Sequence, residues 1–200
     1  MDSHTASDVS AIILSSGLSE RMGQHKALLR WDRSRSFLEK IAIEFLDAGC
    51  SRIFCTVNSS LLPMCESLIT DPRIRFILNE HPEWGRMHSL CLGLKELGRE
   101  AYCFIHNVDN PFITKIIILK ILAAKEPDAW CSPEFSGKGG HPVLLPKSII
   151  REIVKENAKN GTLQETLKRF PKRIVSVDDA SILKNINSPE DYRDLVNHNC

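Results

Sequence analysis

The chain has 200 residues, of which 42% are hydrophobic and 26% charged, with a formal net charge of +1. This is enough apolar material for one well-buried domain and too little for two. The balanced charge argues against nucleic acid as a partner, and no apolar run approaches the ~20 residues of a membrane span, so we expect neither partner.

The first nine residues are polar and lack the basic flank and apolar core of a signal peptide, so we expect residues 1–9 to form a flexible tail. The seven cysteines are scattered, odd in number and without a C-x-x-C pair. Free cysteines in apolar segments behave as small hydrophobes. These features indicate a reduced, cytoplasmic protein.

Short apolar runs then alternate with helical patterns, which is typical of parallel strands joined by crossover helices. The expected strands are Ala11–Ser15, Arg52–Val57, Arg75–Leu78, Tyr102–His106, Ala129–Ser132, Pro142–Leu145 and Ile174–Val177. The expected helices are Phe37–Ala48, Met87–Leu97, Lys115–Ala124 with Thr114 as N-cap, Lys147–Ala158, Leu163–Arg169 and a last helix capped by Ser188. We therefore predict that residues 1–200 form a single three-layer α/β domain with a mostly parallel central sheet. Ligands of such sheets bind beyond the carboxyl ends of the strands.

The loop after the first strand has the composition of a phosphate site. Gly17 and Gly23 allow backbone N–H groups to approach phosphate oxygens, and Arg21 and Lys26 offset phosphate charge. The spacing matches neither the Walker A motif nor G-x-G-x-x-G. From spacing alone, an ordinary strand-to-helix connection explains the loop equally well.

Three later segments also carry candidate chemistry. Asp109 follows a strand and could reach a metal, although composition alone favours a plain Asp-x-Pro turn. Gly85 opens an apolar helix whose first turn could contact a ligand, but an ordinary capped helix is the more economical interpretation. The glycine-rich stretch 135–142 holds Lys138 and His141, and its glycine density slightly favours function. Trp31, Trp84 and Trp130 are isolated, so no aromatic platform for bases is supported.

Taken together, these segments resemble the MobA-like NTP transferase family, most closely its molybdenum cofactor cytidylyltransferase branch. The resemblance runs from about Ala11 to Leu195. The family signature L-A-A-G-x-S-x-R-M-G-x-x-K-x-L-L stands here as Leu14-Ser-Ser-Gly-Leu-Ser-Glu-Arg-Met-Gly-Gln-His-Lys-Ala-Leu-Leu29. Further matches are Arg86-x-x-Ser89, Asp109-Asn-Pro111, Gly140-His-Pro-Val143 and Ser188-Pro-Glu-Asp-Tyr192.

The resemblance implies a Rossmann-like fold of the nucleotide-diphospho-sugar transferase type, and it implies roles for individual residues. The implied nucleotide-binding residues are Ser15, Ser16, Gly17, Ser19, Arg21, Gly23, Lys26, Arg86 and Ser89, the last two at the base or ribose. Lys26, Arg21 and Asp109 are the implied catalytic residues, and Asp109 and Asn187 the implied ligands of Mg²⁺. Lys138, Gly140 and His141 are implied to face the acceptor.

The implied activity is magnesium-dependent transfer of CMP, or of GMP, from an NTP to a phosphorylated acceptor such as molybdopterin or the molybdenum cofactor. A molybdoenzyme or a cofactor-insertion protein is then an expected transient partner. Two departures leave the nucleobase and acceptor open: Ser15-Ser16 replaces Ala-Ala, and Asn185-Ile-Asn187 replaces the D-x-D of the cytidylyl branch. Transfer to a sugar phosphate or other small phosphate, and nucleotide or cofactor binding without catalysis, remain as alternatives.

Overall fold

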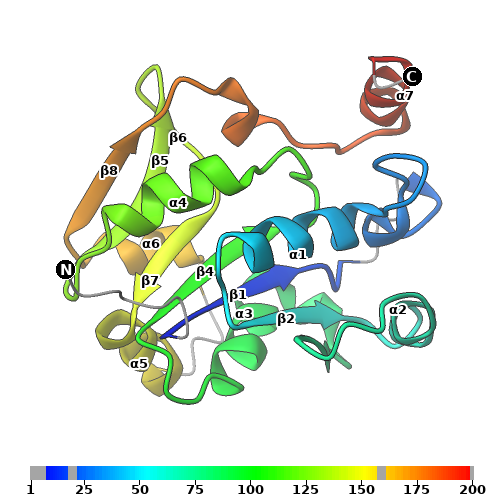
Figure 1. Cartoon of the computed structure of the whole chain (residues 1–200). Helices are drawn as coiled ribbons and strands as arrows, with labels where there is room; N and C mark the ends of the chain where they lie inside the picture. Colours follow the sequence, from blue (N-terminus) through cyan, green and yellow to red (C-terminus); the bar gives the residue numbers. More distant parts are fainter. Residues whose placement is uncertain (1–7, 18–21, 157–160, 199–200) are drawn as a thin grey trace.

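A computed structural model describes residues 8–17, 22–156 and 161–198 of the chain. It shows a three-layer α/β domain in which helices cover both faces of one sheet (Figure 1). The predicted three-layer α/β architecture with a mostly parallel central sheet is confirmed.

The sheet has eight strands in the order β3-β2-β1-β4-β7-β5-β6, and β8 pairs with β5. The strands are β1 (Val9–Leu14), β2 (Arg52–Val57), β3 (Ile74–Leu78), β4 (Tyr102–Asn107), β5 (Trp130–Phe135), β6 (Lys138–Gly139), β7 (Val143–Pro146) and β8 (Lys172–Ser176). The β3-β2-β1-β4 half is parallel, whereas β7 runs antiparallel to both β4 and β5. The sheet is therefore mixed, and its parallel half ends in one common edge.

Strand β1 lies in the middle of this sheet and shows why the domain has two cores. Its side chains alternate between faces, as in any strand. Ala11 and Ile13 pack into the core under α1 and α4, and Ile12 and Leu14 into the core under α3 and α5. The run is apolar on both faces because both faces are covered.

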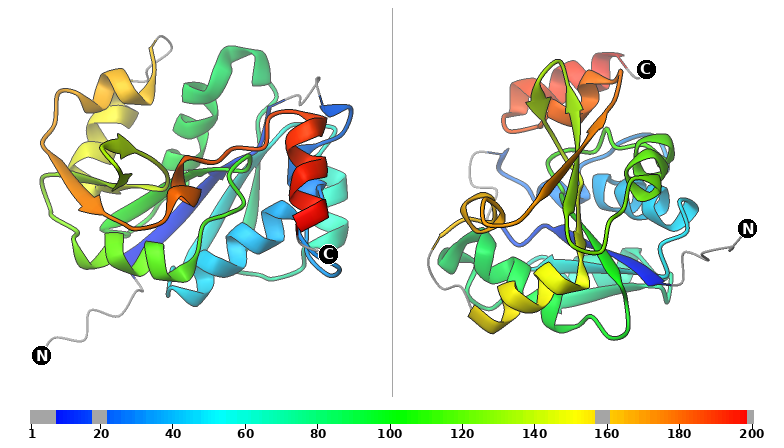
Figure 2. Two further views of the ribbon diagram at one scale, coloured as in Figure 1. Left: turned by 90° about the horizontal axis from the view of Figure 1, so that it is seen from above. Right: turned by 90° about the vertical axis from the view of Figure 1, so that its left-hand side faces the viewer.

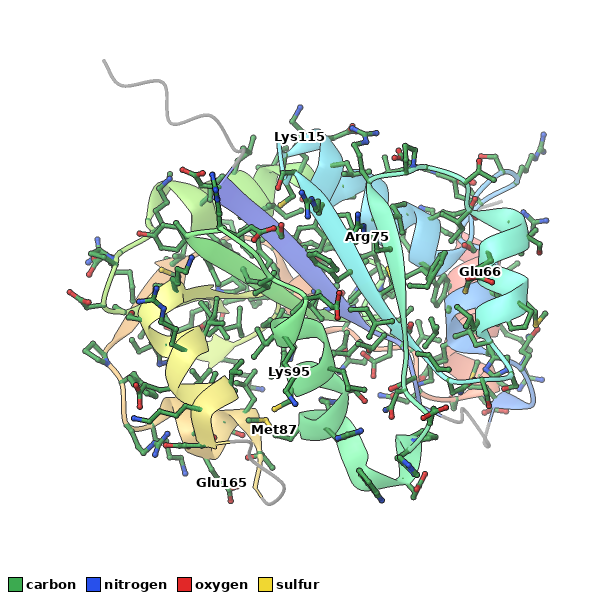
Figure 3. The ribbon with its side chains drawn as sticks, turned by 90° about the horizontal axis from the view of Figure 1, so that it is seen from below. Glu66, Arg75, Met87, Lys95, Lys115 and Glu165 are labelled. Atoms are coloured by element: carbon green, nitrogen blue, oxygen red, sulfur yellow. The ribbon has the colours of Figure 1, made fainter. Side chains whose placement is uncertain are left out.

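The helices are α1 (Phe37–Asp47), α2 (Leu62–Leu68), α3 (Gly85–Lys95), α4 (Lys115–Ala123), α5 (Lys147–Glu156), α6 (Leu163–Leu167) and α7 (Pro189–His198). Figure 3 looks onto the face covered by α3 and α5, where Met87 and Lys95 mark the two ends of α3. Helix α1 begins with a complete capping box between Ser36 and Glu39. Gly93 packs closely, because a Cβ there would lie 3.0 Å from Ile12.

Several predicted details are wrong. Strand β1 begins at Val9, so the expected tail over 1–9 is too long by at least that residue, and residues 1–7 lie outside the described part. Thr114 occupies the N-cap position of α4 as predicted, but its side chain makes no cap bond; Glu44 instead accepts the N–H of Lys115 at 2.5 Å. Helix α2 and the two-residue strand β6 were not predicted at all.

The C-terminal segment runs from β8, at one end of the sheet, to the loop that follows the central strand β1. From β8 it crosses the top of the molecule to α7, which lies beside the loop after β1 (Figures 1 and 2). The Tyr192 hydroxyl bonds both backbone groups of Arg30, each at 3.1 Å. This crossing brings the residues before α7 next to the parallel strand ends. Among the described residues, no helix has the length and apolarity needed to cross a membrane.

Candidate functional site

The candidate site lies where β1 and β4 end side by side. Leu14 and Asn107 are partners in the parallel ladder, and the N–H of Val108 donates to the Leu14 carbonyl at 3.1 Å. The chain beyond each strand opens onto one cavity of about 510 Å³. This first cavity is lined by Leu14, Ser15, Ser16, Gly17, Met22, Lys26, Pro82, Gly85, Arg86, Ser89, Asn107, Val108, Asp109 and Asn187.

The loop predicted to hold phosphates forms one wall of the first cavity. A Cβ on Gly17 would meet nothing within 4 Å, so its backbone borders open space that phosphate oxygens can enter. Gly23 does not line the cavity; its φ of +65° fits a turn that favours glycine. Ser19 and Arg21, also assigned to this loop, lie outside the described residues.

Lys26 and Asn187 meet although they are far apart in sequence. The Lys26 Nζ donates to Asn187 Oδ1 at 2.9 Å. The C-terminal segment is held there because the N–H of Ile186 donates to the Asp109 carbonyl at 2.7 Å. Asp191 then accepts the N–H groups of Asn187 and Ser188 at 2.8 and 2.9 Å, which lowers the pKa of its carboxyl group. The helix cap predicted at Ser188 thus also fixes Asn187 at the cavity.

Asp109 stands two residues beyond the end of β4 and lines the same cavity as Lys26. Its Oδ1 is buried and accepts no hydrogen bond from the described residues. A buried carboxylate oxygen without a partner is costly unless a cation or another donor satisfies it. Asp109 is also the one acidic side chain among the described residues that line this cavity. It is therefore the group best placed to hold a divalent cation.

The serine hydroxyls beside the loop form hydrogen bonds within the protein. Ser15 Oγ donates to the Thr56 carbonyl at 2.7 Å, which ties it to β2. Ser16 Oγ and Ser89 Oγ are 2.7 Å apart, and Asn79 Nδ2 donates to Ser89 Oγ at 2.9 Å. Ser16, Ser89 and Asn79 are all buried, and Asn79 supports from behind the wall that Ser16 and Ser89 form in the first cavity. Asn79 was not predicted as a site residue.

A second cavity of about 590 Å³ adjoins the first and lies toward β5 and α6. Gly140 and His141, which were expected to face the acceptor, line this second cavity, whereas Lys138 lines neither cavity. Arg86 and Lys172 also line it, and the Lys172 Nζ lies 5.0 Å from the Trp130 ring centre. Trp84 lines the same cavity, so two tryptophans that are isolated in sequence border one space. Trp84 directly precedes α3 and Trp130 begins β5, so only the fold places both at this cavity.

His141 sits against a buried polar cluster at the end of β4. Its Nε2 lies 3.2 Å from Asn107 Nδ2, and its ring is 6.3 Å from that of His106. Burial lowers the pKa of His141; nearby Arg86 lowers it further, while Asp109 raises it. Burial also lowers the pKa of His106 to about 3, so this ring is neutral. Neutral His141 can orient Asn107 without adding charge to the site.

Position 140, which lines the second cavity, needs a glycine because the backbone there is packed tightly against Ile182. A Cβ there would stand 2.5 Å from the Ile182 carbonyl oxygen and 2.9 Å from Ile182 Cβ. We expect Gly140→Ala to lower the free energy of unfolding by about 1–3 kcal/mol, the usual cost of overpacking. The matched control is Gly139→Ala, whose Cβ would be 3.5 Å from the flexible Lys172 Nζ. Urea denaturation measures both, and equal midpoints for the two variants would contradict this interpretation.

Comparisons with known proteins agree with this geometry. The sequence profile described as "MobA-like NTP transferase domain" matches residues 11–174. The chain is 28% identical to a molybdenum cofactor cytidylyltransferase of Escherichia coli K12, over 93% of this chain and 94% of that protein. It is 22% identical to a molybdenum cofactor guanylyltransferase of Xanthomonas euvesicatoria pv. vesicatoria, with 94% of each covered.

Among solved structures, Rv0371c of Mycobacterium tuberculosis H37Rv is similar, with a TM-score of 0.81 and 19% identity. The similarity covers 96% of this chain and all of that one, and it supports the fold assignment.

Proposed function

Because the chain belongs to the MobA-like NTP transferase family, we propose that it moves a nucleoside monophosphate from an NTP to a phosphorylated acceptor. In the reaction, a phosphate oxygen of the acceptor attacks the α-phosphorus, the bond from that phosphorus to the β-phosphate oxygen breaks, and pyrophosphate leaves with the electron pair. Such a reaction needs positioning and charge neutralisation more than covalent help. The observation that carries the proposal is that Lys26 and Asp109 line one cavity beside the Gly17 backbone.

Each group has a distinct task in this proposal. The triphosphate lies along Gly17 with Lys26 opposing its charge, and the Ser16–Ser89 wall borders the nucleoside. Asp109 would hold Mg²⁺, and Asn187 Oδ1, which accepts a hydrogen bond from Lys26, would be a neutral second ligand through its other lone pair. The buried, unpartnered Oδ1 of Asp109 fits this role, since Mg²⁺ prefers carboxylate oxygens. When bound, the ion neutralises phosphate charge.

We propose CTP as the nucleotide, with GTP as the alternative, and molybdopterin or the molybdenum cofactor as the acceptor. The relatives named above favour these compounds. The second cavity is lined by Arg86 and Lys172, and by no acidic side chain among the described residues, which suits an anionic acceptor. A sugar phosphate or another small phosphate would also satisfy this charge.

A pyrophosphate-release screen tests the proposal. The four common NTPs are paired with molybdopterin, molybdenum cofactor and a panel of small phosphate esters, with Mg²⁺ or with a chelator. We expect release that requires Mg²⁺, CTP or GTP, and one of the two pterin acceptors. Release with a sugar phosphate alone would change the acceptor. Tight nucleotide binding without release under any condition would favour a binding protein instead.

A further inference from the structure

The two cavities share a short boundary. The residues that line both are Leu14, Gly85, Arg86 and Asn107. They come from the carboxyl ends of β1 and β4 and from the first turn of α3. If the nucleotide occupies the first cavity and the acceptor the second, as proposed above, the reacting phosphate groups must meet at this boundary.

Arg86 is the one charged residue among the described residues at the boundary. Leu14 and Gly85 offer no polar side chain, and the Asn107 amide lies 3.2 Å from His141. The Arg86 side chain is exposed and forms no hydrogen bond or ion pair with any described residue. Its guanidinium is therefore available to a ligand.

A second observation concerns the neighbours of His141, which lines the second cavity. Arg86 lowers the pKa of His141 and Asp109 raises it, so both charges lie near this imidazole. A cation held at Asp109 and the Arg86 side chain would both reach the space in which the bond is made.

We propose that Arg86 bridges the two reacting phosphates: the α-phosphate of the nucleotide and the attacking phosphate of the acceptor. This role rests on the proposed function and replaces the base or ribose contact implied by the sequence pattern. Two phosphates that must approach repel each other, and a guanidinium can donate to both through its planar fork. Arg86 is then a catalytic residue, and Asn107 with His141 shapes the boundary beside it.

Three variants test this role: Arg86→Gln, Arg86→Lys and the control Arg75→Gln. Arg75 is exposed on β3, lines neither cavity and lies away from α5 and α6 (Figure 3). For Arg86→Gln we expect kcat/KM for the acceptor to fall at least ~100-fold, while the Kd of the Mg²⁺–CTP complex rises no more than ~10-fold, because only the α-phosphate contact of the nucleotide is lost. Arg86→Lys should recover part of the loss, because lysine keeps the positive charge but lacks the planar set of N–H donors that can contact two phosphates. A weakened CTP affinity with unchanged acceptor kinetics would overturn the proposal.

A binding experiment separates this proposal from the proposed function. Inorganic phosphate, the smallest stand-in for the acceptor phosphate, is titrated into protein saturated with Mg²⁺ and α,β-methylene CTP. We expect Arg86→Gln to weaken phosphate binding at least ~10-fold relative to wild type and Arg75→Gln. Equal affinities, or no phosphate binding to wild type, would overturn the role of Arg86. Loss of phosphate binding in Arg86→Gln, alongside failure of every acceptor to release pyrophosphate, would support a phosphate subsite at Arg86 and contradict the transfer reaction.

Discussion

Asp109→Asn is expected to lower the turnover of pyrophosphate release at least ~100-fold, the usual scale for losing an electrostatic stabiliser. The substitution keeps the size of the side chain and removes the one carboxylate of the described first-cavity lining. Because the native Oδ1 accepts no hydrogen bond from the described residues, the variant loses no hydrogen bond at that atom and should fold normally.

The measurement is turnover as a function of Mg²⁺ concentration, with thermal unfolding recorded in parallel. The matched control is Asp128→Asn, an exposed carboxylate that lines neither cavity, for which wild-type rates are expected. A folded Asp109→Asn protein with near-normal turnover at limiting Mg²⁺ would remove Asp109 from the metal site.

Lys26→Ala is the second change with a large expected effect, again a loss of at least ~100-fold in turnover. The Lys26 ammonium lines the first cavity and is oriented by the 2.9 Å bond to Asn187 Oδ1. The neutral amide oxygen of Asn187 orients the ammonium, and the Asp191 carboxylate lies near enough for Lys26 to lower its pKa. Lys26→Arg should retain part of the rate, since the cation is kept but its shape changes.

Lys120→Ala, on the exposed surface of α4, serves as the control for removing a lysine. Steady-state kinetics and NTP titration of each variant separate binding from turnover. Unchanged kcat and unchanged NTP affinity in Lys26→Ala would contradict the assignment of the triphosphate to this wall of the cavity.

The parallel half of the fold could be predicted from sequence because its signals are local. Apolar runs bounded by turn residues predicted β1, β2, β3 and β4 to within two residues at each end. The order of these strands and the antiparallel course of β7 could not be predicted, since strand pairing depends on contacts between distant segments. Helix α2 was missed because it is a seven-residue helix with Pro63 near its start and no side-chain cap bond.

The candidate site, too, could be predicted from the sequence only in part. The family pattern predicted Gly17, Lys26, Asp109 and Asn187, and the structure places all four on one cavity. The role of the replacement serines could not be predicted: Ser15 is bonded to β2, and Ser16 is bonded to Ser89. Lys172 was missed because its place at the second cavity depends on the pairing of β8 with β5, which the sequence does not show. Lys138 was chosen because it lies close in sequence to the Gly140-His-Pro-Val143 match, but it lines neither cavity. The identification as a nucleotidyltransferase of the MobA-like family is confirmed.

The central claim is that one cavity holds both the triphosphate and a cation tethered by Asp109. Crystals of the protein grown with Mn²⁺ and α,β-methylene CTP test it directly through the anomalous signal of manganese. The account predicts a manganese peak at coordination distance from the Asp109 carboxylate, with the triphosphate along Gly17 and Lys26. Triphosphate bound elsewhere, or manganese on the nucleotide but away from Asp109, would contradict it.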